Sequence, residues 1–213
     1  MTINTKTLAA IDIGTNAIRL FISNVEEYPT ETLFKKIAFL RVPIRLGEDV
    51  FTTGEIGQQK GKRLCETMQG FSYIMSAFNV ESYKAYATCA MREARNGKSV
   101  AEQIQKECDL NIEIISGTKE AETIFAGGMN EVVDDDKTYL YVDVGGGSTE
   151  VIVYSKSVKV EACSFPLGTV RMLNDAVDKE EMKHFKKWLK NITEKYTPDA
   201  IIGSGGKINK IHK

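Results

Sequence analysis

The sequence predicts an α/β fold made of two lobes with like architecture. An apolar strand that ends in Asp-x-Gly occurs twice, once at residues 8–16 and once at residues 139–150. Each copy is followed by two more β-rich segments and then by helical patterns, so a strand-strand-strand-helix order occurs twice. We expect the first lobe over residues 1–126 and the second over residues 127–213, with the boundary in the acidic, glycine-containing stretch 127–137.

In the first lobe, the opening strand is followed by strand segments at 18–22 and 39–42. Apolar residues then recur at steps of four and three, which predicts one face of a long helix. These residues are Leu64, Met68, Phe71, Met75 and Phe78. The segment Thr52–Glu55 has the pattern of a capping box at the start of that helix.

The remainder of the first lobe alternates between strand and helix. Residues 83–90 are mostly apolar and predict a strand, and Ser99–Glu102 offers a capping box for a helix that runs toward Cys108. A short strand is expected over residues 111–115, and a helix over residues 118–130.

The second lobe continues with strand segments at 151–154 and 158–160. Asp178–Glu181 is expected to cap an amphipathic helix. A short strand over residues 200–203 leads into a glycine turn, and Lys207 begins a further helix. Because that helix stops after a few residues, we expect the second lobe to be incomplete in this sequence.

Composition excludes several classes of protein. The chain has 213 residues, and 28 basic against 29 acidic side chains give a net charge of −1, which argues against a strongly basic nucleic-acid binder. No apolar run is long enough to span a bilayer, and the N-terminus lacks the features of a signal peptide. Four cysteines lie far apart without a Cys-x-x-Cys pair, so we expect free thiols in a reducing cytoplasm and no structural zinc. They are Cys65, Cys89, Cys108 and Cys163.

The two strand-to-loop junctions carry the first chemical signal. Glycine at Asp12–Asn16 lets the backbone approach a ligand closely, and the following N–H groups can point at an anion. The three consecutive glycines of Gly145–Gly147 weaken the flanking strands unless the loop needs such an approach. For the first loop alone an ordinary hairpin turn is the favoured alternative, whereas the three glycines of the second favour a phosphate loop. Together, the two copies favour two phosphate loops that face each other across a cleft between the lobes.

Two further residues stand at strand ends, where ligands bind in open α/β sheets. Arg92 is a planar, permanently charged donor suited to a phosphoryl group. The sequence is equally compatible with a surface arginine that pairs with Glu93 or another carboxylate. Glu120 lies at a strand-to-helix junction and could accept a proton from water. The alternative for Glu120 is a glutamate favoured by the positive end of the helix dipole.

Together these segments resemble the exopolyphosphatase / guanosine pentaphosphate phosphohydrolase family, which belongs to the actin–Hsp70–sugar kinase superfold. The resemblance covers nearly the whole chain, with its motifs in family order. The matching segments are residues 10–16, 45–47, 87–96, 113–121, 143–150, 166–171 and 203–206. The resemblance implies ribonuclease H-like lobes with a cleft between them. Two departures are that family members continue beyond the last glycine loop and that Lys207 stands where the family often has threonine.

The resemblance also implies a reaction: water attacks the terminal phosphoryl group of inorganic polyphosphate and orthophosphate is released. Glu120 would orient or deprotonate the water, and Arg92 would grip the terminal phosphate. The implied phosphate-binding residues are Thr15, Asn16, Arg19, Gly145, Gly146, Gly147 and Ser148. The implied ligands of Mg²⁺ are Asp143, Glu150 and Asp12.

Alternatives to this reaction stay open in the sequence. A guanosine pentaphosphate 5′-phosphohydrolase would share the same phosphate loops. A phosphotransferase of the sugar-kinase type would need a sugar pocket and a catalytic aspartate, and Glu120 after Ser116-Gly117 favours the hydrolase instead. A pair of lobes that binds polyphosphate or nucleotide without turnover is the remaining alternative. The oligomeric state is open, with a homodimer as one candidate assembly.

Overall fold

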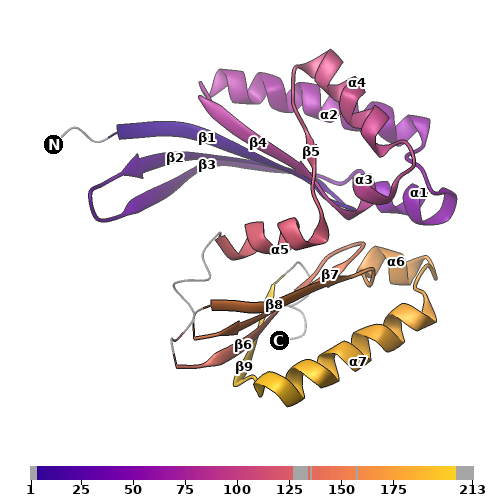
Figure 1. The fold of residues 1–213 in the computed structure, drawn as a ribbon. Coiled ribbons are helices and arrows are strands. Elements are labelled where there is room, and N and C mark those ends of the chain that lie inside the picture. The colour runs from indigo at the N-terminus through magenta and orange to yellow at the C-terminus, as the bar shows by residue number, and fades with distance from the viewer. Residues whose placement is uncertain (1–3, 127–133, 135, 157, 205–213) are drawn as a thin grey trace. The chain divides into compact units, whose positions relative to one another are not determined.

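The computed structural model describes residues 4–126, 134, 136–156 and 158–204, which form two compact units (Figure 1). The first unit is Met1–Ile114 and the second is Ile115–Lys213. This division lies before helix α5 (Gly117–Ala126), whereas the sequence placed the boundary after it, because α5 packs on strands of the second unit. Most of the stretch 127–137, including residues 127–133, lies outside the described residues. Each unit is described by itself.

The first unit is built on a five-stranded mixed sheet in the order β3-β2-β1-β4-β5. β1, β2 and β3 pair antiparallel, and β4 and β5 run parallel to β1. The strands are β1 (Asn4–Ile13), β2 (Ile18–Glu27), β3 (Thr32–Val42), β4 (Ser82–Ala87) and β5 (Glu113–Ile114). The three opening strands expected from the sequence are therefore confirmed.

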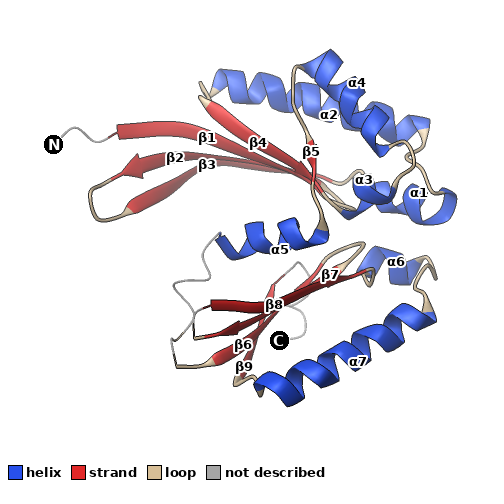
Figure 2. Ribbon diagram, in the orientation of Figure 1, coloured by secondary structure: helices blue, strands red, loops and turns tan. Residues whose placement is uncertain are grey.

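Helices cover one face of this sheet (Figure 2). They are α1 (Leu46–Thr53), α2 (Gln58–Ala77), α3 (Cys89–Glu93) and α4 (Gly97–Cys108). The predicted apolar face of α2 is confirmed, because the four residues of that pattern that lie within the helix are buried in one core with the strands. Phe78, the fifth residue of that pattern, is the C-cap and is 43% exposed.

The strand expected over residues 83–90 is wrong at its carboxyl end. β4 ends at Ala87, and the next residues turn into the short helix α3. The N–H of Thr88 donates to the carbonyl of Ile13 at 3.1 Å, and the N–H of Arg92 donates to the carbonyl of Thr88 at 3.0 Å. Thr88 therefore joins the first strand to a helical turn. The apolar residues of α3 are buried in a helix rather than a strand, a distinction that an apolar run does not make.

The two predicted capping boxes in the first unit are also wrong. Residues 52–55 end α1 instead of starting α2: the C-cap Gly54 has φ 79° and its N–H donates to Val50. α2 begins after Gly57, whose N–H donates to the carboxylate of Asp49 at 3.1 Å. α4 begins at Gly97, two residues before the predicted Ser99. In both cases the Ser/Thr-x-x-Glu pattern is present, but tertiary contacts determine that the helix starts at another residue.

The second unit repeats the topology of the first. Its four-stranded sheet has the order β8-β7-β6-β9, with β6, β7 and β8 antiparallel and β9 parallel to β6. The strands are β6 (Thr138–Val144), β7 (Thr149–Ser155), β8 (Val158–Phe165) and β9 (Ala200–Ser204). This is the order of β3-β2-β1-β4, so the repeat expected from the sequence is confirmed. The helix predicted from Lys207 onward lies outside the described residues.

Helices lie on both faces of the second sheet. Ala121 of α5 packs with Tyr139, Tyr141, Ile152 and Tyr154 on one face. α7 (Lys179–Tyr196) packs on the other face, while α6 (Thr169–Leu173) follows the last antiparallel strand.

The predicted cap of α7 is confirmed, because the side chain of Asp178 accepts a hydrogen bond from the N–H of Glu180 at 2.9 Å. Such a bond satisfies one of the helix's unpaired N–H groups.

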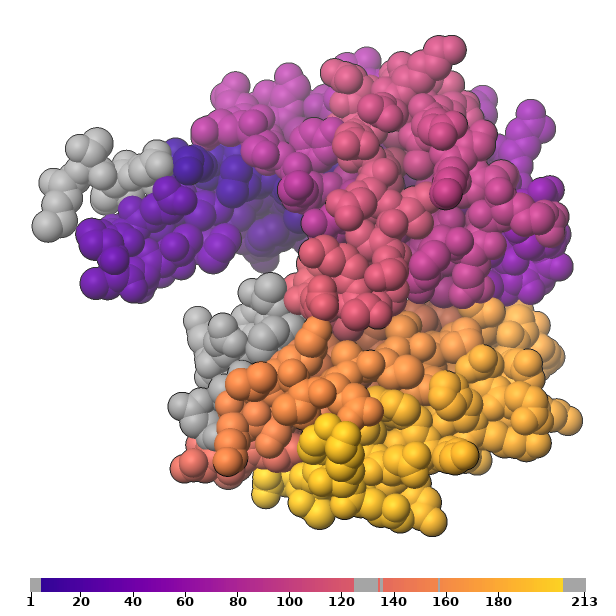
Figure 3. Space-filling model, viewed as in Figure 1, coloured from indigo at the N-terminus to yellow at the C-terminus, as the bar shows by residue number. Residues whose placement is uncertain are grey.

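The outer strand of the first unit is unusually exposed. Figure 3 shows the far end of the β2–β3 hairpin projecting from the body of that unit. Along β3, Phe34 and Phe39 are 70% and 54% exposed. β3 is therefore an exposed edge strand of the first sheet.

The four cysteines are free thiols, as expected. Cys65 of α2 and Cys108 of α4 approach with their Sγ atoms 3.8 Å apart. Burial, a hydrogen bond to Glu107 and the neighbouring Cys108 raise the pKa of the Cys65 thiol to about 12. Within the described part of the chain, no helix is long and apolar enough to cross a membrane.

Candidate functional site

The first predicted loop connects β1 to β2 and is held from behind by the start of α1. The N–H of Gly14 donates to the carbonyl of Ala17 at 3.2 Å, which closes the turn. The carbonyls of Thr15 and Asn16 then accept from Gly47 and Arg45 at 3.0 Å each. A Cβ on Gly47 would lie 2.3 Å from the Thr15 methyl, so this close approach requires glycine.

The polar side chains of this loop differ in exposure. Thr15 is buried, and Asn16 is exposed. Asp12 and Arg19 stand directly opposite each other on β1 and β2, and they form an ion pair. Asp12, which was expected to help hold a metal, is therefore already neutralised in part by a guanidinium; its role as a ligand stays a prediction.

Arg92 lies at the same end of the first sheet. β4 runs parallel to β1, so their carboxyl ends meet, and α3 begins beside the first loop through the Thr88–Ile13 hydrogen bond. Arg92 is half-buried in the last turn of α3. The structure thus brings Arg92 to the strand ends that carry Thr15 and Asn16.

The residues that follow Arg92 have a structural task. The Arg95 guanidinium donates to the carbonyl of Thr53 at 3.0 Å. The Asn96 side chain accepts from the N–H of Ile56 at 2.9 Å and donates to its carbonyl at 2.8 Å. These bonds attach the loop between α1 and α2 to the start of α4. Arg95 and Asn96, the last residues of the matching segment 87–96, therefore have a structural role.

The second predicted loop, Gly145–Ser148, connects β6 to β7 and is held in a similar way by α6. The N–H of Gly145 donates to the carbonyl of Ser148 at 2.9 Å. The loop carbonyls accept from the start of α6: Thr169 donates to Gly145 at 3.0 Å, and Val170 donates to Gly146 at 2.8 Å.

Two further contacts fix the second loop. The Arg171 side chain donates from Nε to the carbonyl of Gly147 at 3.0 Å. A Cβ on Gly168 would lie 2.3 Å from the carbonyl oxygen of Gly146 and 2.4 Å from the Gly147 nitrogen. Glycine at 168 is therefore required for α6 to reach the loop backbone.

These contacts determine where the loop N–H groups point. In a planar trans peptide the C=O of one residue and the N–H of the next point in opposite directions. Because the carbonyls of Gly145, Gly146 and Gly147 point at α6 and Arg171, the N–H groups of Gly146, Gly147 and Ser148 point away from them. Three consecutive N–H groups on one side of a loop make a concavity that suits an anion.

The same reasoning applies to the first loop, with two groups instead of three. The Thr15 and Asn16 carbonyls face the start of α1, so the N–H groups of Asn16 and Ala17 point away from it. Each unit therefore presents a short run of N–H groups beside the end of its first strand. The predicted cleft that would bring the two loops face to face stays a prediction.

The second loop is flanked by two acidic residues. Asp143 and Glu150 are directly opposite each other on β6 and β7, so their side chains share a face of the sheet. Glu150 is only 1% exposed and accepts a hydrogen bond from the Ser164 hydroxyl at 2.8 Å. Like charges in opposed positions are destabilising unless a proton or a cation lies between or beside them.

The negative charge of this pair contributes to the pKa of a nearby tyrosine. Tyr141, two residues before Asp143, donates or accepts a hydrogen bond with the Ser204 hydroxyl. Its pKa is raised above the ordinary tyrosine value, mainly by burial and further by the charges of Asp143 and Glu150.

The donor set near Tyr141 is all oxygen, which suits Mg²⁺. Within the described residues no group of three or more histidine, cysteine, aspartate and glutamate side chains is assembled, so the protein offers a carboxylate pair rather than a complete cage. Mg²⁺ usually keeps several of its waters, so a pair fits it.

Glu120 lies in the first turn of α5, the helix that covers this same face. The N–H of Lys119 donates to the Ser116 hydroxyl at 3.1 Å, and the N–H of Glu120 donates to the Ser116 carbonyl at 2.9 Å, so Ser116 starts the helix. The next residue, Ala121, packs with Tyr141 and with other residues of the face. Glu120 is half-buried, with its Oε2 atom shielded from solvent.

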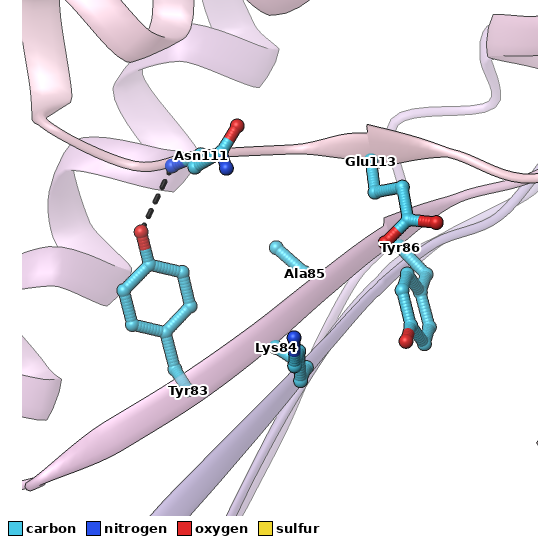
Figure 4. A pocket seen from close by; sticks show the side chains of 6 residues that line it. All are labelled: Tyr83, Lys84, Ala85, Tyr86, Asn111 and Glu113. Atoms are coloured by element: carbon cyan, nitrogen blue, oxygen red, sulfur yellow. Dashed lines mark hydrogen bonds between the residues drawn. The ribbon is translucent and has the colours of Figure 1, made fainter.

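A separate hollow opens between β4 and β5 (Figure 4). These strands pair only at Tyr86–Glu113 and Ala87–Ile114, and where they diverge the Tyr83 hydroxyl accepts a hydrogen bond from the N–H of Asn111 at 2.8 Å. None of the six residues that line the hollow belongs to the predicted site.

Sequence reasoning named the loops but missed what supports them. In the first unit, Lys60 bonds to the carbonyl of Arg45 at 2.8 Å and to the carboxylates of Glu48 and Asp49 at 3.0 and 2.7 Å. The pKa of Glu48 is lowered chiefly by Lys60. The only sequence signal for these supports was the family resemblance of segments 45–47 and 166–171, which contain the residues that hold the two loops.

The two units, each with the strand order 3-2-1-4 and a loop after its first strand, define a protein of the actin-like ATPase fold, as the sequence predicted. The crystal structure of an exopolyphosphatase from Cytophaga hutchinsonii matches with a TM-score of 0.84 and 25% identity, over 97% of this chain and 69% of that chain. The chain belongs to the Ppx/GppA phosphatase family, whose family model matches residues 21–209.

Curated relatives agree with this family. A bifunctional 3-dehydroquinate synthase/phosphatase from Fusobacterium nucleatum is 32% identical over 168 residues, which are 77% of this chain and 25% of the relative. Exopolyphosphatase 2 from Mycobacterium tuberculosis is 28% identical over 170 residues, which are 78% of this chain and 53% of the relative. The chain thus spans about half the length of the second relative, and a quarter of the first.

Proposed function

We propose that this chain forms the phosphate-binding and catalytic part of a hydrolase that releases terminal orthophosphate from inorganic polyphosphate by attack of water. The observation that carries the proposal is the second loop, where three consecutive N–H groups point away from α6 beside an opposed pair of carboxylates. Membership of the Ppx/GppA family and the likeness to exopolyphosphatases support this reading.

Phosphoryl transfer needs positioning and neutralisation of charge more than covalent chemistry. The N–H groups of Gly146, Gly147 and Ser148 bind phosphate oxygens at the second loop. Thr15 and Asn16 bind phosphate oxygens at the first. Arg92 holds the terminal phosphate, because a guanidinium offers two parallel donors to a phosphoryl group.

The remaining residues assist the attack. Asp143 and Glu150 would hold Mg²⁺, which when bound supplies positive charge that neutralises phosphate oxygens. Asp12 is kept as a further candidate ligand, and Arg19 both pairs with Asp12 and adds positive charge beside the first loop. Glu120 orients the attacking water and takes its proton, as expected of a half-buried carboxylate beside this face.

The test compares Glu120→Gln with wild type, with Mg²⁺ and long-chain polyphosphate as substrate and orthophosphate release as the readout. We expect a loss of about 100-fold or more, since a general base contributes about 10² to 10⁴. Glu122→Gln is the matched control, because Glu122 lies on the same helix and binds Lys159 at the surface at 2.9 Å. Equal losses in the two variants would contradict the role of Glu120.

A parallel assay with guanosine pentaphosphate decides between the two substrates that the family description names together. Faster release from guanosine pentaphosphate would move the proposal to the 5′-phosphohydrolase. Tight binding of polyphosphate without any release by wild type would replace the hydrolase with a binding protein.

A further inference from the structure

One residue beside the first loop has a backbone conformation that its type and position do not explain. Six described residues other than glycine have positive φ. Five of them end helices or occupy the β7–β8 turn, where this conformation is ordinary. They are Asn79, Asp109, Lys156, Asp175 and Thr197. The sixth, Arg45, has φ 61° and ψ 50° and precedes a helix, α1.

The backbone of Arg45 is fixed on both sides. Its N–H donates to the carbonyl of Asn16 in the first loop at 3.0 Å, and its carbonyl accepts from Lys60 Nζ at 2.8 Å. The Lys60 side chain is only 17% exposed and also binds Asp49 at 2.7 Å. The left-handed conformation is therefore the one that joins the loop to the helix.

None of these backbone bonds needs an arginine side chain. Glycine adopts the left-handed conformation without a steric penalty, so a purely structural role would favour glycine here. The Arg45 side chain is 62% exposed, and its contact with Glu48, at 3.3 Å, is a surface pair three residues apart on one helix start. Such pairs contribute little to stability.

From this we infer that Arg45 is a substrate-binding residue whose guanidinium binds a phosphate of the polyanion held at the first loop. This inference rests on the proposed function. The conformation of Arg45 fixes the start of its side chain one hydrogen bond away from Asn16, and a planar guanidinium binds phosphate through two donors at once. Strained residues of this kind cluster where ligands bind.

The experiment uses Arg45→Gly, which keeps the left-handed backbone and removes the side chain. Lys156→Gly is the matched control, because it also removes an exposed basic residue from a left-handed position, in the turn between β7 and β8. Arg45→Lys keeps the charge and loses the planar fork. Melting temperature, polyphosphate affinity and steady-state kinetics are measured for all four proteins.

We expect Arg45→Gly to melt at or above the wild-type temperature. Its KM and its dissociation constant for polyphosphate should rise about 10-fold, as for loss of a charge-assisted contact, with kcat little changed. The KM and the dissociation constant of Arg45→Lys should lie between those of wild type and Arg45→Gly. Lys156→Gly should bind polyphosphate as wild type does.

Three results would overturn the inference. Wild-type affinity in Arg45→Gly would remove the substrate contact while leaving the hydrolase proposal intact. A large drop in melting temperature in both Arg45 variants would make the side chain structural. A wild type that neither binds nor hydrolyses polyphosphate would contradict the proposed function itself, and Arg45 as a substrate-binding residue with it.

Discussion

The loops that follow β1 and β6 share one design and differ in charge. Each turn is closed by a glycine N–H, at Gly14 and Gly145, and each is held through its carbonyls by the start of a short helix. The residues that flank the turn differ: Asp12 faces Arg19 in the first unit, and Asp143 faces Glu150 in the second. The same hairpin therefore ends in a neutral pair in one unit and in a doubly acidic pair in the other.

This difference shows that two loops with the same backbone arrangement can present different charges to a ligand. The Asp12–Arg19 ion pair beside Thr15 and Asn16 has no net charge, so it repels phosphate less than two neighbouring carboxylates do. The two carboxylates beside Gly145–Gly147 are oxygen ligands of the kind that Mg²⁺ prefers, and a bound cation would favour phosphate there. We therefore expect both loops to bind phosphate through their N–H groups, and we expect binding at the second loop alone to depend on a metal ion.

The largest effect on stability is expected at the two glycines that allow a helix start to contact each loop, Gly168 and Gly47. Gly168→Ala should lower the free energy of unfolding by about 3 kcal/mol, because the new Cβ would meet the backbone of Gly146 and Gly147, which has no rotamer to escape into. Gly47→Ala should cost less, about 1–2 kcal/mol, because its closest neighbours are the Thr15 methyl and the Phe51 ring.

Urea unfolding monitored by fluorescence measures both variants. Gly70→Ala is the control, since nothing lies within 4 Å of a Cβ there. A Gly47→Ala variant that is damaged more than Gly168→Ala would contradict the account of the two supports.

A smaller effect is expected from the charged network that supports the first loop alone. Lys60→Met should lower the free energy of unfolding by about 2 kcal/mol, because Glu48, Asp49 and the Arg45 carbonyl lose their shared cation. Lys62→Met should change it by less than about 0.5 kcal/mol, since Lys62 is 77% exposed and its nearest partner is 3.8 Å away.

The pH dependence of that difference follows from Glu48. Its pKa is lowered in the folded protein, so its contribution is complete above the ordinary glutamate pKa of about 4.3 and is lost as the pH falls through the lowered value. The gap between Lys60→Met and wild type should therefore narrow in acid. A gap that widens below that pH would show that Lys60 does not act through Glu48.

The strands and the repeat could be predicted because local patterns carry them. Apolar runs that end in Asp-x-Gly marked β1 and β6, and the Asp178 cap is a contact within one turn of chain. The positions at which α2 and α4 begin, after Gly57 and Asn96, could not be predicted. They depend on hydrogen bonds to Asp49 and Ile56, which lie 8 and 40 residues away in the sequence.

The candidate site divides in the same way. Its glycines and carboxylates could be named from the sequence, since each lies in a short motif. The opposition of Asp143 and Glu150 needed the strand register, and the directions of the loop N–H groups needed the contacts with α6. Residues 45–47 were part of the family resemblance, but the left-handed conformation of Arg45 could not be predicted, because arginine has no preference for it.

Mg²⁺ binding tests the division between the loops most directly. Calorimetric titration with Mg²⁺ should give saturable binding to wild type that is abolished in Glu150→Gln, which keeps an acceptor for the Ser164 hydroxyl. Arg19→Gln, which breaks the neutral pair of the first unit, should bind Mg²⁺ as wild type does. Undiminished binding in Glu150→Gln, or its loss in Arg19→Gln, would contradict the assignment of the metal to the second loop.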